Sequence, residues 1–257
     1  MGGVVFLFWK KRNDLKAEHD EKAIARRIRK NKGFNYLGDA VLGGIDGSVT
    51  TFAVVAGATG GNFDRIVIIV LGFANLIADG FSMAVSNYLR SKSEREKIDK
   101  TWQKEEQQIR EIPGGERQEI RQIFSNKGFK GEILEKIVEK ITNNKQLWLE
   151  TMVTEEYGLP LKGASPIMAG MVTFWAFLII GILPLIPFLF GNFNYITRFI
   201  MSSVITALAF LLIGLVKGII LKTPVIKSGV QTLMTGGIAA ALAYLAGAVL
   251  RRFYGVD

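Results

Sequence analysis

Residues 171–190 read MVTFWAFLIIGILPLIPFLF, and no charged residue occurs between Lys162 and Arg198. A helix needs roughly 20 consecutive apolar residues to cross the hydrocarbon core of a bilayer. Residues 230–250, VQTLMTGGIAAALAYLAGAVL, form a second uncharged stretch of similar length. The two stretches predict membrane-spanning helices, so the fold class is that of an all-α integral membrane protein.

Three more spans are expected, although two of them contain acidic residues. Residues 199–221 are interrupted only by Lys217, near the end of the run, where a lysine can reach the membrane interface. Residues 36–60 and 66–89 are apolar and are joined through a tight Gly60-Gly61-Asn62 turn. They could instead be buried helices of a soluble domain, but their lengths and the three later spans favour a five-helix membrane bundle.

The placement of charge sets the orientation and excludes one class of partner. The net charge of +9 could suggest nucleic-acid binding, but ten Lys or Arg residues lie between Lys10 and Lys32, just before the first span. Such juxtamembrane charge attracts anionic lipid and marks the cytoplasmic side. We therefore expect a lipid membrane as partner and no nucleic acid. Arg251 and Arg252 disagree with the predicted orientation, because they follow the last span on the opposite side. Met1–Trp9 lacks the basic start and cleavage site of a signal peptide.

These predictions divide the chain into a basic cytoplasmic segment (1–34), spans 1 and 2 (35–90), a soluble helical insertion (91–162) and spans 3 to 5 (163–257). The insertion carries apolar residues at helical spacing. No Gly or Pro lies between Met83 and Pro113, so span 2 is expected to continue into the cytosol. Breaks are expected at 113–115 and 126–128, with further helices at about 131–141 and 146–157.

Two aspartates in the apolar spans are the strongest functional signal. A carboxylate at a helix centre in the membrane costs about 2.5–3.5 kcal/mol or more, and it persists mainly where it faces a bundle interior, a partner or water. Asp46 lies in GGIDGSVTTFAVVAG (43–57), where it could instead cap a broken helix, and Asp79 lies four residues before Met83. Asp39 is either a pathway-mouth ligand or a helix-start residue. With no cysteine and one histidine, His19, the available oxygen and thioether ligands suit Fe²⁺ or Mn²⁺.

The insertion holds 14 of the 23 acidic residues. Glu105 and Gln108 lie one helical turn apart, as do Glu116 and Glu119, and Met152 and Glu156. Carboxylates paired in this way can bind a metal, but Lys and Arg interleave with them, and spacing alone favours a solvated, ion-paired face. No phosphate loop, zinc motif or nucleophile–base pair is present, so no enzyme activity is expected.

The motifs GGIDGSVTTFAVVAG (43–57) and ADGFSMAVSNYLRSKSE (78–94) resemble the vacuolar iron transporter family of plant and yeast vacuolar Fe²⁺/Mn²⁺ transporters and prokaryotic relatives. GILPLIPF (181–188) and KSGVQTLMTGGIAAALAYLAGAVL (227–250) add to the likeness, which covers about residues 35–252. The resemblance implies five spans, a homodimer with the pathway at its interface, and a cytoplasmic helical metal-binding domain after span 2. It also implies Fe²⁺ export from the cytosol by proton antiport, without an organic cofactor.

By motif, Asp46 and Met83 match the family's pathway ligands. Within the insertion, the resemblance favours the metal-binding reading for Glu105, Glu116, Glu119, Met152 and Glu156. The chain departs from the family at Gln108 and Val153, which stand where ligands are expected. Asn87 stands in place of a glutamate, and Asp79 adds a carboxylate where many relatives have a small residue.

We therefore expect a divalent metal transporter in the plasma membrane of a prokaryote, or in a vacuolar or other organelle membrane of a eukaryote. The predicted metal ligands are Asp46, Asp79, Met83, Glu105, Gln108, Glu116, Glu119, Met152 and Glu156. The alternative is a membrane-anchored metal-binding or sensing protein that does not transport, whose ligands would be confined to the insertion.

Overall fold

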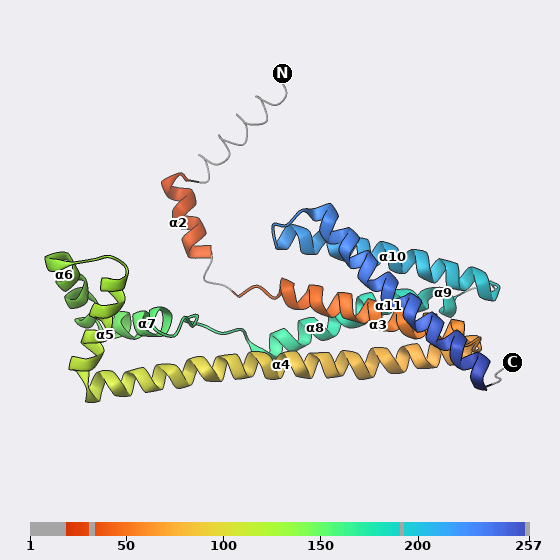
Figure 1. Ribbon diagram of the computed structural model, residues 1–257, viewed down its shortest axis with the longest axis horizontal. Helices are drawn as coiled ribbons and strands as arrows, with labels where there is room; N and C mark the ends of the chain where they lie inside the picture. The colour runs from red at the N-terminus through yellow and green to blue at the C-terminus, as the bar shows by residue number, and fades with distance from the viewer. Residues whose placement is uncertain (1–18, 31–33, 191–192, 255–257) are drawn as a thin grey trace, which may run out of the picture. The chain divides into compact units, whose positions relative to one another are not determined.

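The computed structural model describes residues 19–30, 34–190 and 193–254 (Figure 1). It divides into two units, Met1–Asn35 and Tyr36–Asp257, which are taken separately. The first contains α2 (Glu21–Lys30), with the basic sequence EKAIARRIRK. Met1–Trp9 and the basic residues from Lys10 to Lys16, on which part of the sequence interpretation rests, lie outside the described residues.

The second unit is helical, and five of its described helical segments are long and apolar enough to cross a membrane. They are α3 (Leu37–Gly60), α4 (Arg65–Glu111), the α8–α9 segment (Pro166–Leu189), α10 (Tyr195–Ile220) and α11 (Val225–Tyr254). The prediction of an all-α protein with five apolar spans is therefore confirmed. Apart from α4, which continues to Glu111, each span begins and ends within about five residues of the apolar stretch that predicted it.

Helix α4 extends well past the membrane-length part of its sequence. Its apolar residues end near Leu89, and the same helix then continues for more than 20 residues to Glu111. Three shorter helices follow at its C-terminal end: α5 (Pro113–Asn126), α6 (Gly131–Thr142) and α7 (Lys145–Glu155) (Figure 1). They pack around a small core that contains Ile120, Val138 and Trp148. The continuation of the second span into a longer helix, followed by short helices, is thus as predicted, and of these helices α6 is clearly amphipathic whereas α7 is not.

Two proline-containing positions differ from what the sequence suggested. Pro113 is the first residue of α5 rather than part of a longer break, because a proline in the first turn of a helix lacks only an N–H that would have no helical partner. The third span is not one continuous helix. Helix α8 ends at Gly181, and a 3₁₀ turn at Leu183–Leu185 leads into the short α9 (Ile186–Leu189). Pro184 and Pro187 remove the N–H groups that a continuous α-helix would use there.

Helix α3 is central to the apolar bundle, where it contacts α4, α8, α10 and α11. Glycines let its backbone approach its neighbours closely. A Cβ atom on Gly47 would lie 2.5 Å from the Phe177 carbonyl oxygen of α8, and one on Gly60 would lie 2.2 Å from the Tyr244 carbonyl oxygen of α11. Small residues of this kind are a common means of packing membrane helices. The helix is unbroken through Asp46, so this residue does not cap a helix end.

Gly47→Ala is therefore expected to destabilise the bundle by about 1–3 kcal/mol, because the new methyl group overlaps the α8 backbone. Thermal unfolding of detergent-purified protein, followed by circular dichroism, measures the effect. Gly237→Ala in α11 is the matched control, since a Cβ atom on Gly237 would meet nothing within 4 Å. This control should be neutral or stabilising. Equal melting temperatures for Gly47→Ala and the wild-type protein would contradict the packing account.

Candidate functional site

Asp46 of α3 and Asp79 of α4 are brought together by the register of two antiparallel helices. Asn75 of α4 donates hydrogen bonds from Nδ2 to the side-chain oxygens of Thr50 (3.2 Å) and Thr51 (3.5 Å) of α3. One turn toward the N-terminus of α3 lies Asp46, and one turn toward the C-terminus of α4 lies Asp79. The two carboxylates are close enough to interact electrostatically. Met83 follows one turn after Asp79 and packs against the apolar core.

At the end of this interface Asp39, Asn87 and Arg90 form a polar cluster, which Thr173 of α8 joins. Asp39 lies in the first turn of α3 and is buried. The Asn87 amide donates to Asp39 Oδ1 (2.9 Å) and to Thr173 Oγ1 (2.7 Å). Its own oxygen accepts from Arg90 Nη2 (2.8 Å), and Arg90 pairs with Asp39 at 3.4 Å. Both polar ends of Asn87 are therefore engaged, so its side chain fixes Asp39 and Arg90 rather than offering a free metal ligand.

Polar pairs thus continue along one side of the α3–α4 interface. They run from Thr50 and Asn75, through Asp46 and Asp79, to Asp39 and Asn87 near the end of the apolar part of α4. We call this set the polar ladder. Polar groups on facing helices of a membrane bundle are costly unless they bind each other, water or an ion. The ladder sets oxygen-bearing side chains at successive turns of the two helices.

A second group of predicted ligands meets at the far end of α4. Glu105 of α4, Glu116 of α5 and Met152 of α7 are each at most 1% exposed. Within the described residues, the buried carboxylate oxygens without a hydrogen-bond partner all belong to Glu105 (Oε2) and Glu116 (both oxygens). Gln108 Oε1 is buried and unpartnered as well. Native proteins rarely leave such groups unsatisfied, so this arrangement indicates a place for a ligand that the carboxylates would bind.

The electrostatics of this acidic cluster point the same way. Burial raises the pKa of Glu116 from 4.5 to about 7, and the nearby carboxylates of Glu119, Glu105 and Glu156 act in the same direction. Burial also raises the pKa of Glu156, with Glu105 and Glu119 contributing. Each pKa rises because an ionised carboxylate is disfavoured beside other carboxylates in a poorly solvated place. A divalent cation would remove that penalty.

The other members of the cluster contribute unequally. Glu119 and Glu156 are exposed, whereas Val153 is fully buried and offers only an aliphatic side chain. Met152 belongs to the core of α5–α7, so packing accounts for part of its presence. In the described part of the chain, no three His, Cys, Asp or Glu side chains are placed so that they could hold a metal ion as they stand. Glu105, Glu116, Glu119 and Glu156 are close enough to interact electrostatically. The buried Gln108 oxygen and Met152 lie one helical turn from Glu105 and Glu156 along the chain.

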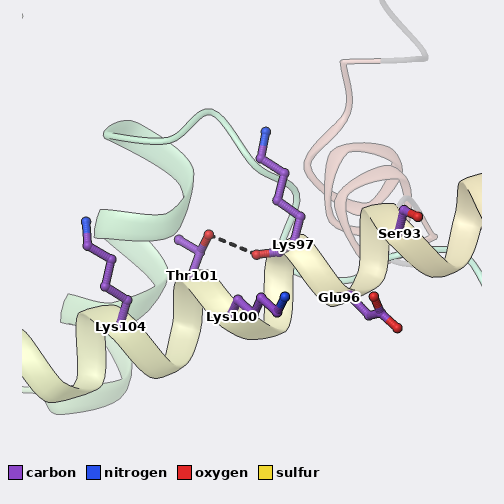
Figure 2. Close-up of a pocket in the computed structure, with 6 residues that line it drawn as sticks. All are labelled: Ser93, Glu96, Lys97, Lys100, Thr101 and Lys104. Atoms are coloured by element: carbon purple, nitrogen blue, oxygen red, sulfur yellow. Dashed lines mark hydrogen bonds between the residues drawn. The ribbon is translucent and has the colours of Figure 1, made fainter.

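The stretch of α4 between the two groups of acidic residues carries a basic surface. Lys97, Lys100 and Lys104 line a cavity of about 390 Å³, together with Ser93, Glu96 and Thr101 (Figure 2). Three ammonium groups and one carboxylate make this surface a poor site for a cation. A metal ion moving between the two groups would therefore avoid this face of α4.

Comparison with known proteins identifies the family. The model of the VIT family matches residues 37–248. The chain belongs to the VIT family. It is similar to a vacuolar iron transporter of Toxoplasma gondii, with 30% identity over 236 residues that cover 88% of this chain and 78% of that protein. It is also similar to vacuolar iron transporter 2 of Oryza sativa subsp. japonica, with 32% identity over 209 residues that cover 80% and 84%. A vacuolar iron transporter of Plasmodium falciparum is 30% identical over 220 residues, 82% and 81% of the two chains.

Membership in the VIT family confirms the resemblance inferred from the motifs. Together with the five apolar helices, it makes the chain a multi-pass membrane protein of a plasma or organelle membrane. Family membership also supports the prediction that the protein transports a metal, with iron as the substrate, and that it is a transporter rather than an enzyme.

Sequence reasoning missed two features of this VIT-family chain. The Asp39–Asn87–Arg90 cluster joins residues about 50 positions apart, and only the start of the charged sequence at Arg90 hinted at it. Tyr157, whose hydroxyl group contacts Glu105 at 2.8 Å, gave no signal, because it lies just after α7 in a stretch that ends at Gly158.

The raised pKa of Glu116 predicts how pH acts on the metal-free protein. The folded protein holds this proton up to about pH 7, whereas the unfolded chain releases it near pH 4.5. This group therefore destabilises the fold as pH rises between those values, by at most roughly 3 kcal/mol and by less where solvent screens the charge. Glu116→Gln should remove that loss, so the metal-free variant melts higher than the wild type at pH 8 but not at pH 5.

Differential scanning fluorimetry in the presence of a chelator measures both melting temperatures. Glu139→Gln is the control, because Glu139 is exposed on α6 and should change neither value. If the wild-type protein and Glu116→Gln show the same dependence on pH, then Glu116 does not carry a raised pKa.

Proposed function

We propose that the protein exports Fe²⁺ from the cytosol, with Mn²⁺ as a second ion, and that protons move in the opposite direction. The observation that supports the proposal is the polar ladder, in which the half-buried Asp46 and Asp79 of two apolar helices are close enough to interact electrostatically. Carboxylates at such a depth are costly without a function. Their oxygen atoms, with the Met83 thioether one turn away, suit a partly dehydrated Fe²⁺ or Mn²⁺. The names of the relatives, vacuolar iron transporters, support the same ion.

Residues 91–162 would form a cytoplasmic metal-binding domain that collects the ion. The buried, unpartnered oxygens of Glu105 and Glu116 support this role. Gln108 and Met152 would add a neutral oxygen and a sulfur, and rotation of the exposed Glu119 and Glu156 would close the site. The side is assigned by the excess of Lys and Arg before span 1 and between spans 2 and 3.

Collection and translocation would be separate steps. Glu105 and Met83 lie on the same continuous helix, 22 residues apart, which corresponds to about 33 Å at 1.5 Å per residue. No single ion can bridge that distance, and the basic surface of α4 lies between the two sites. The acidic cluster would therefore raise the local concentration of the metal ion and release it before it reaches the ladder.

A homodimer is part of the proposal. Ser82 and Ser86 of α4 are exposed in the single chain, and Asp79 is only half-buried. Because a carboxylate facing lipid is costly, a second copy of the chain is a better neighbour for this side of α4 than lipid. Two copies would also double the number of oxygen ligands, as an octahedral shell requires. Protonation of an aspartate on the acidic side would then weaken its hold on the ion and help to release it.

Asp46→Asn should lower the initial rate of Fe²⁺ transport at least about tenfold, because the ladder loses the charge that binds the ion. The assay measures anaerobic Fe²⁺ uptake into proteoliposomes with and without a pH gradient. Asp64→Asn is the matched control. Asp64 is exposed, and at the N-cap of α4 its side chain makes no capping hydrogen bond.

Wild-type transport that does not respond to the pH gradient would exclude proton antiport. Undiminished transport by Asp46→Asn would exclude the ladder as the pathway. Wild-type protein that binds Fe²⁺ without transporting it would instead indicate the membrane-anchored metal-binding protein considered as the alternative.

A further inference from the structure

Two side chains outside the predicted ligand set form a hydrogen-bonded chain that ends on Glu105. Lys104 Nζ donates to the hydroxyl oxygen of Tyr157 at 2.7 Å, and the Tyr157 hydroxyl donates to Glu105 Oε1 at 2.8 Å. Lys104 also lies over the Tyr157 ring, 5.2 Å from its centroid. It projects from α4 at the edge of the basic surface (Figure 2).

The chemistry of the three groups fixes the direction of both hydrogen bonds. A lysine ammonium group can only donate, so the phenol oxygen must accept from it. The single phenol proton is then directed at the carboxylates, where Glu105 accepts it on Oε1 and Glu156 is a second acceptor within reach. In this arrangement, Oε1 is the oxygen of Glu105 that the Lys104–Tyr157 pair engages.

The other oxygen of Glu105 is left for a ligand. Oε2 is buried and has no hydrogen-bond partner when both carboxyl groups are ionised, and the nearby carboxyl group of Glu116 can share a proton with Glu105 when it is protonated. Glu105 as a whole is 1% exposed, so water does not compete freely for Oε2. Glu105 thus has one oxygen that accepts a hydrogen bond from Tyr157 and one oxygen that accepts none. This arrangement suits a carboxylate that binds a cation through a single oxygen.

We propose that Tyr157 is a positioning residue that holds Glu105 as a one-oxygen ligand and thereby makes the acidic cluster prefer small divalent transition-metal ions to Ca²⁺. The inference rests on the proposed function, because it assumes that the cluster binds the transported ion. Tyr157 does not touch the metal. It acts only through the orientation of Glu105.

The preference follows from the coordination habits of the ions. Ca²⁺ takes six to eight oxygen ligands at about 2.3–2.6 Å and often binds a carboxylate through both oxygens. Smaller divalent ions take fewer ligands at shorter distances and accept single oxygens, and Mn²⁺ and Fe²⁺ tolerate amide and thioether partners. If Ca²⁺ used both oxygens of Glu105, it would have to share Oε1 with the Tyr157 hydrogen bond, which occupies one lone pair of that oxygen and fixes its direction. Gln108 and Met152 in the cluster favour the smaller ions further.

The test compares Mn²⁺ and Ca²⁺ binding to the full-length protein in detergent by isothermal titration calorimetry. Tyr157→Phe keeps the ring and removes the hydrogen bond. It should lower the ratio of the Ca²⁺ to the Mn²⁺ dissociation constant about tenfold, the scale of one hydrogen bond to a charged group. Lys104→Met leaves the Tyr157–Glu105 bond possible and should change the ratio less. Tyr254→Phe is the control, since Tyr254 is 78% exposed at the end of α11.

If Tyr157 has only a structural role, Tyr157→Phe will weaken the binding of Mn²⁺ and Ca²⁺ by similar factors and leave the ratio of their dissociation constants unchanged. That result would overturn the inference. If wild-type protein binds Mn²⁺ and Glu105→Gln abolishes the binding while Tyr157→Phe keeps the wild-type ratio, the inference fails and the proposed cluster stands. If Glu105→Gln and Glu116→Gln leave Mn²⁺ binding intact, the acidic cluster itself is wrong as a metal site, and the inference falls with it.

Discussion

The burial of carboxylates without partners is the constraint around which the functional parts of this protein are arranged. Leaving a buried polar group unsatisfied costs about 1–3 kcal/mol, and more when the group is charged. The chain does so at Glu105 and Glu116. The two carboxylates come together because α4 extends beyond its apolar sequence, so that Glu105 lies near Glu116 of α5. Both residues are buried, as is Met152 of α7. The same helix carries Asp79 and Met83, so one uninterrupted backbone sets the distance between the two groups of ligands.

Most of the fold was predictable because the membrane restricts what a span can be. Apolar stretches with at most two charged residues each predicted the five spans. The lack of Gly or Pro between Met83 and Pro113 predicted that α4 continues past its apolar part. The break in the third span was not predicted, although the sequence contains Pro184 and Pro187 at that position. A proline pair weakens a helix, but whether the helix breaks depends on neighbouring packing, here including Ser202, which donates to the Pro184 carbonyl oxygen at 2.7 Å.

The candidate site was predictable only in part. Spacing placed Glu105 with Gln108 and Glu116 with Glu119, but it favoured a solvated face, because burial is a property of tertiary packing. The structure makes Glu105 and Glu116 inaccessible, whereas Glu119 is exposed. Contacts between distant positions, such as Asp39 with Arg90 and Glu105 with Tyr157, leave no mark in local spacing.

We propose that Glu105 and Glu116 bind a divalent cation, and calorimetry tests this proposal directly. Anaerobic calorimetric titration of Fe²⁺ into the full-length protein near pH 6.5, repeated in two buffers with different ionisation enthalpies, counts the ions bound and the protons released. Because the pKa of Glu116 is about 7, the wild-type protein should release close to one proton on binding. The double variant Glu105→Gln, Glu116→Gln should lose that binding event and its proton. Unchanged stoichiometry and proton release in the double variant would contradict the claim.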